Sequence, residues 1–395
     1  MKILKVLCEL RPSGAEMMIK CATPYWIKEG CEVHVLALSA KIGEYASNMR
    51  EAGCVVHHIP IQRGWKLALC LWRYFVLLQD MKPDVVHVHA ESLSAFTTII
   101  PRFLKIRSFR SILNSFPFSG RVRLQKICER AFQRIWKCYQ IAISPSISRN
   151  EKAKLFNPTI LCWPWFNDIY FHPPTFSERI SARANLGLLD DQIVLLSVGN
   201  GNDVKNLSSI IEALALIQPT TASLHDPLPL SSTQACEFAN KHNLIYLFVG
   251  NEHPHQLERK TAEKLSMSSL VRFCGPQMDL CKYREHLWAA DVFLMPSKYE
   301  GFSIAALEGL SCGLNCIFAD SPGLKDLKEF LFPIIWSGTD AASIAEKLLK
   351  MITEGGCRKI NIESATAVRS EFGTERRSGE YLRLWKDAVS KKASG

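Results

Sequence analysis

Two carboxylates, Glu300 and Glu308, bracket the stretch EGFSIAALE in the second half of the chain. The preceding DVFLMPS has the short apolar run of a buried strand, and SIAALEGLSC is typical of a helix closed by a glycine. Ser303 is a good N-cap residue, so the backbone amides from Gly301 onward would lie at a helix N-terminus, which favours anions. The arrangement predicts a diphosphate-linked ligand whose phosphates meet these amides and whose hydroxyl groups, at opposite ends, are each bound by one glutamate. The alternative is that both glutamates are merely solvated surface charges.

Further phosphate-binding candidates lie in loops that follow strand-like runs. Gly199 and Gly201 follow IVLLSV and form a fragment of a dinucleotide loop. Lys205 comes next, at the start of the helical pattern NLSSIIEALALI, where a cation and helix amides can share one phosphate. Gly14 follows the first strand-like run and opens another helix. Residue types alone leave two alternatives open here, an exposed lysine at a helix start and an ordinary tight turn.

Strand-like runs alternate with helical patterns along the whole chain, and the alternation is interrupted once, by the proline- and aromatic-rich WPWFNDIYFHPP. Short β-branched runs separated by helices predict parallel sheets covered on both faces. We therefore expect an α/β protein of two doubly wound domains, residues 1–165 and 166–370, with a C-terminal helix over 371–395 that packs back towards the first domain. Ligands of such sheets bind outside the carboxyl ends of the strands, so the expected site is the cleft between two facing domains.

The composition supports a globular protein of two domains. The chain has 395 residues, of which 47% are hydrophobic and 22% charged. Its N-terminus reaches Arg11 and Pro12 too soon for a signal peptide, and the most apolar helical run, 65–81, is too short and too charged to span a bilayer. We expect a cytoplasmic protein. The 14 cysteines include no C-x2-C pair, so no metal site is expected.

Positive charge is concentrated between residues 102 and 154. This segment has 13 basic and two acidic residues, whereas the whole chain has a net charge of +10. The basic residues are Arg102, Lys105, Arg107, Arg110, Arg121, Arg123, Lys126, Arg130, Arg134, Lys137, Arg149, Lys152 and Lys154. They form either a solvated helix face or a surface for anionic lipid at the inner face of the membrane or for an anionic acceptor. No nucleic-acid motif accompanies them, so no nucleic-acid partner is expected.

Together these residues resemble the retaining GT-B glycosyltransferases of glycosyltransferase family 4, of the bacterial exopolysaccharide and capsule type. The E-x7-E motif EGFSIAALE carries the resemblance, supported by PDVVHVHAESLSAF and CYQIAISPS in the first half. The resemblance implies a GT-B fold with two Rossmann-like domains facing a central cleft. In this fold residues 1–165 would be the acceptor domain and residues 166–370 the nucleotide-sugar donor domain. It also implies that no divalent metal is needed, because cations and helix N-termini stabilise the departing diphosphate.

The resemblance also assigns roles to individual residues. Glu308 would bind the ribose hydroxyls of the nucleotide, and Glu300 would hold the donor sugar as a catalytic residue. The diphosphate would lie against the remaining members of the motif and the glycine-rich loops, namely Gly14, Gly199, Asn200, Lys205, Gly301, Phe302 and Ser303.

Two positions depart from the family pattern. Asn200 stands where the family has a phosphate-binding arginine. The first-domain histidine that contacts the donor sugar falls at Phe116, with Asn114 as the alternative. His89 lies near the end of the neighbouring strand-like run and is the candidate catalytic histidine here, although histidines on strands are often structural.

The predicted function is transfer of a sugar from a nucleotide-diphosphate donor to a lipid-linked or glycan acceptor, with retention at the anomeric carbon. A UDP-sugar is the favoured donor and a GDP-sugar the other candidate. Because Asn200 and Phe116 replace family residues, a catalytically impaired donor-binding or scaffold partner of another glycosyltransferase is the alternative. A GT-B sugar-nucleotide epimerase is a third hypothesis, for which the sequence offers no matching acid and base residues.

Overall fold

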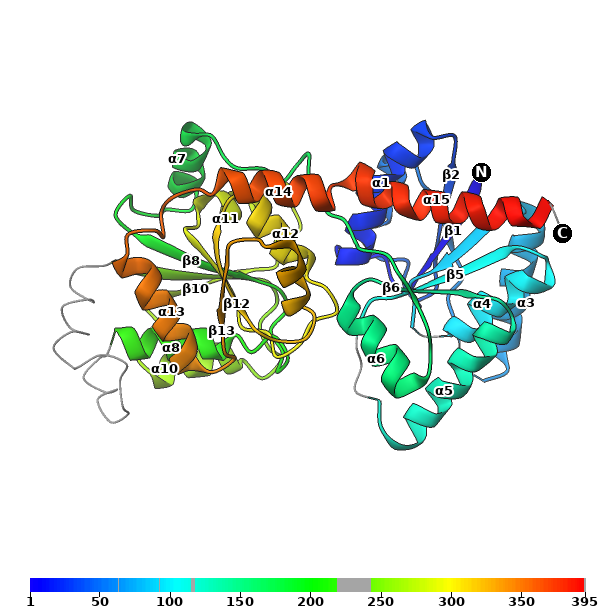
Figure 1. The fold of residues 1–395 in the computed structure, drawn as a ribbon, viewed down its shortest axis with the longest axis horizontal. Helices are drawn as coiled ribbons and strands as arrows, with labels where there is room; N and C mark the ends of the chain where they lie inside the picture. The colour runs from blue at the N-terminus through cyan, green and yellow to red at the C-terminus, as the bar shows by residue number, and fades with distance from the viewer. Residues whose placement is uncertain (63, 92, 115–117, 219–242, 394–395) are drawn as a thin grey trace. The chain divides into compact units, whose positions relative to one another are not determined.

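The computed structural model describes residues 1–62, 64–91, 93–114, 118–218 and 243–393 (Figure 1). The chain divides into two compact units. Unit 1 comprises residues 1–167 and 371–395, and unit 2 comprises residues 168–370. The last segment of the chain therefore belongs to the same unit as the first.

Unit 1 contains a seven-stranded sheet in the order β3-β2-β1-β4-β5-β6-β7, in which every neighbouring pair is parallel. Its strands are β1 (Lys2–Leu7), β2 (Glu32–Ala37), β3 (Val55–His58), β4 (Val85–Val88), β5 (Arg107–Ile112), β6 (Tyr139–Ala142) and β7 (Ile160–Leu161). Its helices are α1 (Gly14–Lys28), α2 (Ala46–Glu51), α3 (Lys66–Met81), α4 (Ser94–Phe103), α5 (Gly120–Ile135), α6 (Pro145–Leu155) and α15 (Thr374–Ala393). From β1 the strands are added first to one side, as β2 and β3, and then to the other side, beginning with β4. This is the strand order of a doubly wound fold.

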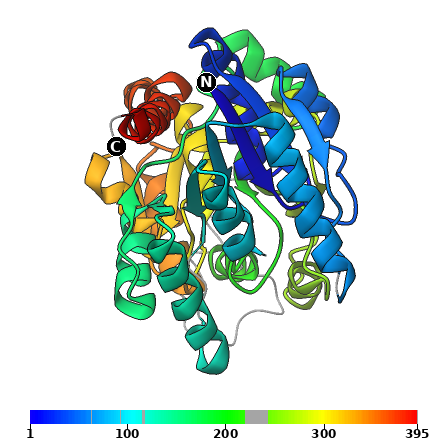
Figure 2. The ribbon, with the colours of Figure 1, turned by 90° about the vertical axis from the view of Figure 1, so that its right-hand side faces the viewer.

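Helices cover both faces of the unit 1 sheet (Figures 1 and 2). Leu4 and Val6 of β1 pack with α3 in one buried cluster. Lys5, between them, points to the other face, where its Nζ lies 4.7 Å from the ring of Trp26 on α1 and 4.0 Å from that of Trp385 on α15. The alternation of side chains along one strand thus fixes which helices lie on which face.

Unit 2 contains a six-stranded parallel sheet in the order β10-β9-β8-β11-β12-β13. Its strands are β8 (Ile193–Val198), β9 (Leu244–Val249), β10 (Val271–Gly275), β11 (Val292–Met295), β12 (Asn315–Ala319) and β13 (Ile334–Ser337). Its helices are α7 (Phe176–Asn185), α8 (Ser208–Ile217), α10 (Leu257–Lys264), α11 (Leu280–Ala289), α12 (Ile304–Ser311) and α13 (Ala341–Thr353), with a 3-10 helix over Lys325–Phe330. Helix α14 (Ile362–Phe372) leads from unit 2 into unit 1.

The prediction of an α/β fold with two doubly wound, Rossmann-like domains is confirmed by these two sheets. The helical pattern over 65–81 is α3, and among the described residues no helix is long and apolar enough to cross a membrane. The two-residue strand β7 was not predicted, because Ile160 and Leu161 lie beside the proline- and aromatic-rich stretch and are too few to show a period.

Candidate functional site

In unit 2 an ion pair joins the loops that follow two neighbouring strands. The Nζ of Lys205, in the loop after β8, lies 2.6 Å from the Oε1 of Glu300, in the loop after β11. The hydroxyl of Ser297 donates to the same Glu300 oxygen at 2.8 Å. Both ends of the pair remain partly accessible, with 23% of the Lys205 side chain and 13% of the Glu300 side chain exposed. An ammonium group has three donors, so Lys205 can hold Glu300 and still meet an anion.

The sequence predicted that a helix begins directly at Lys205, whereas the structure places this residue in the turn before the helix. Helix α8 begins at Ser208, and Asn206 has a left-handed φ of 57°, which prevents the helix from starting earlier. The side-chain oxygen of Asn202 accepts hydrogen bonds from the amides of Val204 and Lys205 at 3.0 and 2.9 Å. This turn fixes the backbone from which the Lys205 side chain extends.

Two glycines allow the backbone to come close to the ion pair. Gly199 has φ +142°, and a Cβ there would lie 3.4 Å from Cε of Lys205, so the lysine side chain runs over this glycine. Gly323 has φ +88°, and a Cβ there would lie 2.2 Å from the carbonyl oxygen of Glu300. The loop that carries Glu300 is therefore pressed against the chain at Gly323, which leaves the carboxylate little freedom.

The helix N-terminus after Glu300 has the predicted cap. Ser303 is the N-cap of α12, and its hydroxyl accepts a hydrogen bond from the amide of Ala306 at 3.3 Å. Gly301, Phe302 and Ser303 are all buried. The structure therefore confirms a strand, a turn and a capped helix in this order, and the turn places Glu300 ahead of the helix amides.

Glu308 lies inside α12 with only 4% of its surface exposed. The hydroxyl of Tyr283, on α11, donates a hydrogen bond to its Oε2 at 2.7 Å. Burial raises the pKa of Glu308 to about 8, although the hydrogen bond from Tyr283 acts in the opposite direction. Near neutral pH this carboxyl is therefore largely protonated, unlike a carboxylate on a solvated surface.

Asn200 holds a neighbouring loop. Its Oδ1 accepts a hydrogen bond from the Nδ2 of Asn251, in the loop after β9, at 2.9 Å. The residue itself is exposed. A neutral amide thus occupies the position at which the family resemblance implied a second phosphate-binding cation.

In unit 1 a pocket of about 220 Å³ lies where β1 and β4 end. After β1 the chain continues to one side of the sheet, and after β4 it continues to the other side. Such a point in a parallel sheet has a crevice at the carboxyl ends of the strands, in which ligands of these folds bind. The lining residues come from the end of β1 (Leu7 and Cys8), the N-terminus of α1, the segment after β4 (His89 to Glu91) and the end of β5 with the residues that follow it (Ser111, Leu113 and Asn114). Gly14 is the first residue of α1, between Ser13 and Ala15 in the wall of this pocket.

His89 stacks on His87, a buried residue of β4, with ring centroids 4.4 Å apart. His87 is held from both sides, with its Nδ1 3.2 Å from Lys5 Nζ and its Nε2 2.9 Å from the Ser111 hydroxyl. Burial, and then the nearby Lys5, lower the pKa of His89 well below its usual value. Both His89 ring nitrogens are shielded from solvent and bonded to none of the described residues. The imidazole is therefore neutral, and both of its nitrogens lack a hydrogen-bond partner among the described residues.

Two carboxyl groups of the unit 1 pocket have opposite electrostatic surroundings. Burial raises the pKa of Glu16 on α1, although Ser13 donates a hydrogen bond to its carboxylate. For Glu91 burial acts in the same direction, but the charges of Arg110, Arg130 and Lys126 outweigh it and lower the pKa to about 2. Carboxyl groups with separated pKa values in one pocket are a common property of functional sites.

The structure brings together some of the predicted residues. Lys205 bonds to Glu300 and runs over Gly199, and Glu300 lies in the turn before the N-cap of α12. Glu308 has a separate environment beside Tyr283. Phe116 lies outside the described residues, whereas Asn114 lines the unit 1 pocket.

Sequence reasoning missed four polar residues of these sites: Ser297, Tyr283, Glu16 and Glu91. Ser297 and Glu91 directly follow strand-like runs, and Glu16 stands beside Gly14, so the rule that sites follow strand ends could have found them. Across the described residues, no group of three or more histidines, cysteines or carboxylates is arranged to hold a metal ion.

The sequence of unit 2 matches a known family. Residues 178–367 match the family described as "Glycosyl transferases group 1". The D-inositol 3-phosphate glycosyltransferase of Geodermatophilus obscurus is 31% identical over 172 residues, which are 43% of this chain and 36% of the relative. The enzyme of the same name from Kribbella flavida is 26% identical over 220 residues, 55% of this chain and 49% of the relative. The matches thus span between a third and a half of each relative's length.

Solved structures resemble the whole chain. HepE of Anabaena in complex with UDP has a TM-score of 0.78 at 15% identity, covering 98% of this chain and 100% of HepE. Sucrose-phosphate synthase of Thermosynechococcus elongatus has a TM-score of 0.72 at 15% identity, covering 99% of both chains. At this identity the likeness concerns the fold. Residues 178–367 are therefore similar to the glycosyl transferases group 1 family, and the chain as a whole has the GT-B fold of two Rossmann-like domains.

Proposed function

We propose that this protein transfers a sugar from a nucleotide-diphosphate donor, with a UDP-sugar favoured over a GDP-sugar, to a lipid-linked or glycan acceptor, with retention at the anomeric carbon. The observation that carries the proposal is the Lys205–Glu300 pair directly ahead of the capped helix α12. It combines a cation, helix amides and a carboxylate within the segment that matches the glycosyl transferases group 1 family. The UDP in the structure of HepE supports the choice of nucleotide.

In the proposed mechanism the acceptor hydroxyl forms the bond to the anomeric carbon as the bond to the diphosphate breaks, and the departing diphosphate takes the hydroxyl proton. Lys205 and the amides that follow Glu300 stabilise the charge of that diphosphate. Such donors act most strongly when they are held in place before the reaction, and the turn at Asn202 and the contact at Gly323 hold them. Glu300 accepts hydrogen bonds from the donor sugar, and Glu308 binds the ribose hydroxyls. Because these groups supply the electrostatic stabilisation, we propose that the transfer needs no divalent cation.

The test is release of UDP from UDP-sugars by the full chain, with and without a lipid-linked oligosaccharide fraction, and with the product's anomeric configuration read by NMR. We expect acceptor-dependent UDP release, a retained configuration and unchanged turnover in EDTA. Lys205→Met removes the cation and is expected to lower kcat/KM about a hundredfold, the usual effect of losing one preorganised oxyanion contact. Lys298→Met, at an exposed lysine two residues before Glu300, is the matched control. An inverted product or a strict need for metal would contradict the mechanism.

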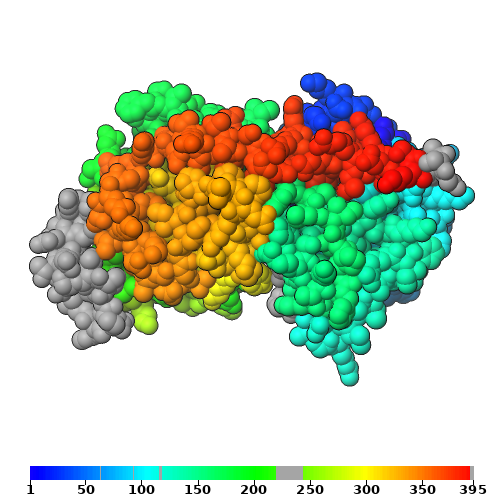
Figure 3. Space-filling model, viewed as in Figure 1, coloured from blue at the N-terminus to red at the C-terminus, as the bar shows by residue number. Residues whose placement is uncertain are grey.

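The basic segment supports a second part of the proposal, contact with an anionic membrane. At the start of α5, residues 119–125 are all exposed, including Arg121, Val122, Arg123 and Leu124. Farther along the same helix, 74% of Ile135 is exposed. In Figure 3 residues 118–155 (teal to green) form a continuous surface of unit 1. Exposed apolar residues next to arginines are typical of helices that lie in a lipid interface.

Not all of the basic segment belongs to this surface. Arg110 and Arg130 are buried, with 1% exposure each. The exposed members of the segment are Lys105, Arg121, Arg123, Arg134, Lys137, Arg149, Lys152 and Lys154. The charge available to a membrane is therefore smaller than the sequence count.

Vesicle sedimentation tests the membrane contact. The protein is expected to bind vesicles that contain 30% phosphatidylglycerol, to bind pure phosphatidylcholine weakly, and to be released by salt because surface charges are screened. Arg121→Glu with Arg123→Glu should abolish this binding. The control is Lys260→Glu with Lys264→Glu, on the exposed side of α10 in unit 2. Equal vesicle binding by both double variants would refute the assignment.

A further inference from the structure

Glu91 lies in the wall of two pockets of unit 1. It lines the pocket of about 220 Å³ at the ends of β1 and β4, together with Glu16 and His89. It also lines a larger, more open pocket between α4 and α5, together with Phe96 and Phe132. With 31% of its side chain exposed, Glu91 is accessible to a ligand, although buried charges lie behind it.

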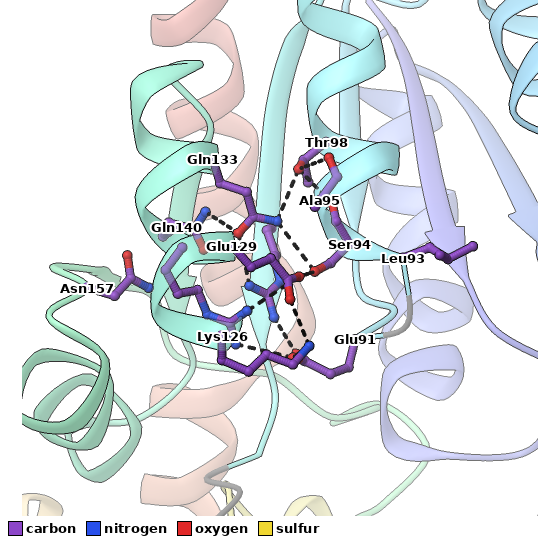
Figure 4. A network of polar contacts seen from close by, with 12 residues as sticks. Glu91, Leu93, Ser94, Ala95, Thr98, Lys126, Glu129, Gln133, Gln140 and Asn157 are labelled. Carbon is purple, nitrogen blue, oxygen red and sulfur yellow. Dashed lines mark hydrogen bonds and ion pairs between the residues drawn. The ribbon is translucent and has the colours of Figure 1, made fainter. Parts of the chain in front are cut away.

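Three cations hold the Glu91 carboxylate (Figure 4). Its Oε1 accepts from Lys126 Nζ at 2.8 Å and from Arg130 Nη2 at 3.3 Å, and its Oε2 accepts from Arg110 Nη2. These contacts keep Glu91 ionised and fix its orientation. Two carboxylate oxygens can accept about four hydrogen bonds, so the group retains capacity for a ligand hydroxyl.

Gln133, which is labelled in Figure 4, and Glu151 hold the two arginines in place. Gln133 accepts from Arg110 Nη1 at 3.1 Å and donates to Thr98 Oγ1 at 3.1 Å. Glu151 accepts from Arg130 Nε at 3.1 Å. Burying two guanidinium groups costs free energy, and apolar side chains could pack β5 against α5 without that cost. The network therefore makes sense as the support of a carboxylate that must stay charged at the edge of a pocket.

His89 gives an independent indication that this pocket takes a ligand. Its ring nitrogens are shielded and bonded to none of the described residues, and a buried polar group without a partner is costly. The ring is neutral, so it can pair with a hydroxyl group. The pocket has the size of a single ring rather than of a drug-sized molecule.

The family resemblance already implies that the first domain takes the acceptor. We propose that Glu91 sets the acceptor specificity of this chain: it accepts hydrogen bonds from the hydroxyls of one acceptor ring in the unit 1 pocket, and the pocket favours an uncharged or amine-bearing ring over a phosphorylated one. The inference rests on the proposed glycosyl transfer and assigns the acceptor side of it. A ring hydroxyl needs an acceptor that is always ionised and fixed, which the cations behind Glu91 provide. Loss of such a charged hydrogen bond weakens binding about 10- to 150-fold.

The preference for an unphosphorylated ring follows from the charges that face the pocket. Its described lining residues include Glu16 and Glu91 but no lysine or arginine. The cations near Glu91 are already bonded to it and lie behind its oxygens, so a phosphate would meet carboxylates first. This chain would thus differ in acceptor from the relatives that are named D-inositol 3-phosphate glycosyltransferases.

The test uses pairs of octyl glycosides, each compared with its 6-phosphate, titrated by saturation-transfer NMR into the full chain in the presence of UDP. At least one uncharged or amino glycoside is expected to bind, and its phosphate to bind at least tenfold more weakly. Glu91→Gln should weaken glycoside binding about tenfold or more while the UDP affinity is unchanged. The control is Glu129→Gln, because Glu129 also pairs with Lys126 in the same network but does not line this pocket.

The outcomes separate this inference from the proposed function. If UDP binds but the phosphorylated glycosides bind as tightly as the uncharged ones, or no glycoside binds, the inference is overturned and the donor site stands. Equal effects of Glu91→Gln and Glu129→Gln would also overturn it. Should Glu91→Gln fail to fold, Glu91→Asp keeps the charge beside Arg110 and Arg130 but withdraws the oxygens from the pocket. Glycoside binding that is unaffected by this change would contradict the role of Glu91.

Discussion

Replacing Glu308 by glutamine should make the protein more stable at alkaline pH and at the same time weaken nucleotide binding. Glu308 is buried, and its pKa in the folded protein is raised to about 8. A carboxyl whose pKa is raised on folding contributes stability that is complete below its unfolded value and is lost as the pH rises through the folded value. Glutamine resembles the protonated carboxyl in shape, and its oxygen can still accept the hydrogen bond from Tyr283.

The size of the effect follows from the two pKa values. A change from the ordinary 4.5 to about 8 corresponds to a free-energy difference on the order of 4 kcal/mol between pH 4 and pH 9. Wild type should lose this amount of unfolding free energy across that interval, and Glu308→Gln should not. In a domain of about 200 residues, 1 kcal/mol shifts Tm by roughly 2–4 °C, so the variant should melt about 10 °C higher than wild type at pH 9.

Differential scanning calorimetry of both proteins from pH 5 to pH 9 measures this difference, and the comparison cancels the titration of all other groups. The curves should converge near pH 5 and separate towards pH 9. Titration with UDP at pH 9, where the wild-type carboxyl is ionised, should show about tenfold weaker binding to Glu308→Gln, because an uncharged amide is a poorer partner for ribose hydroxyls than a carboxylate. A variant that melts with the wild-type pH dependence would refute the buried, protonated state of Glu308. Unchanged UDP affinity would refute its role in ribose binding.

Three other substitutions test the geometry around α12. Ser303→Ala removes the N-cap hydrogen bond to Ala306 and should cost about 1 kcal/mol of unfolding free energy, measured by urea denaturation. Gly323→Ala places a Cβ 2.2 Å from the Glu300 carbonyl oxygen at φ +88°, so it should lower both Tm and UDP affinity, and a neutral result would mean that this contact is not tight. Tyr283→Phe removes the hydroxyl bonded to Glu308, so it should cost about 1–3 kcal/mol and move the alkaline loss of stability to higher pH; a shift to lower pH would contradict the assigned hydrogen bond.

Much of the unit 2 site around Lys205 and Glu300 could be predicted from the sequence, because its residues follow strands in loops and at a helix start. Ser303 follows a strand and a turn, and its residue type alone predicts the cap that the structure contains. The pairing of Lys205 with Glu300, 95 residues later, follows once β8 and β11 are known to be neighbours. Loops that follow neighbouring parallel strands meet at one edge of the sheet.

The remaining features depend on tertiary packing, which residue types do not encode locally. Nothing in the pattern around Glu308 indicates that Tyr283 of another helix would bond to it. The basic segment shows the same limit. Counting charges assigned Arg110 and Arg130 to a surface, whereas the direction of their side chains places them beneath Glu91. A count of charges cannot distinguish an arginine that faces solvent from one that is buried behind a carboxylate.

The most direct test of the central claim is calorimetric titration of the full chain with UDP, GDP, ADP and the corresponding diphosphate sugars, repeated with Lys205→Met and with Lys298→Met. We predict that at least one nucleotide, UDP first, binds wild type and Lys298→Met equally, and that Lys205→Met binds it at least tenfold more weakly. At 100 times its Kd the bound nucleotide should also stabilise the protein by about 2.7 kcal/mol. The absence of binding by every nucleotide at millimolar concentration, or equal binding by Lys205→Met, would contradict a nucleotide-sugar site at Lys205 and Glu300.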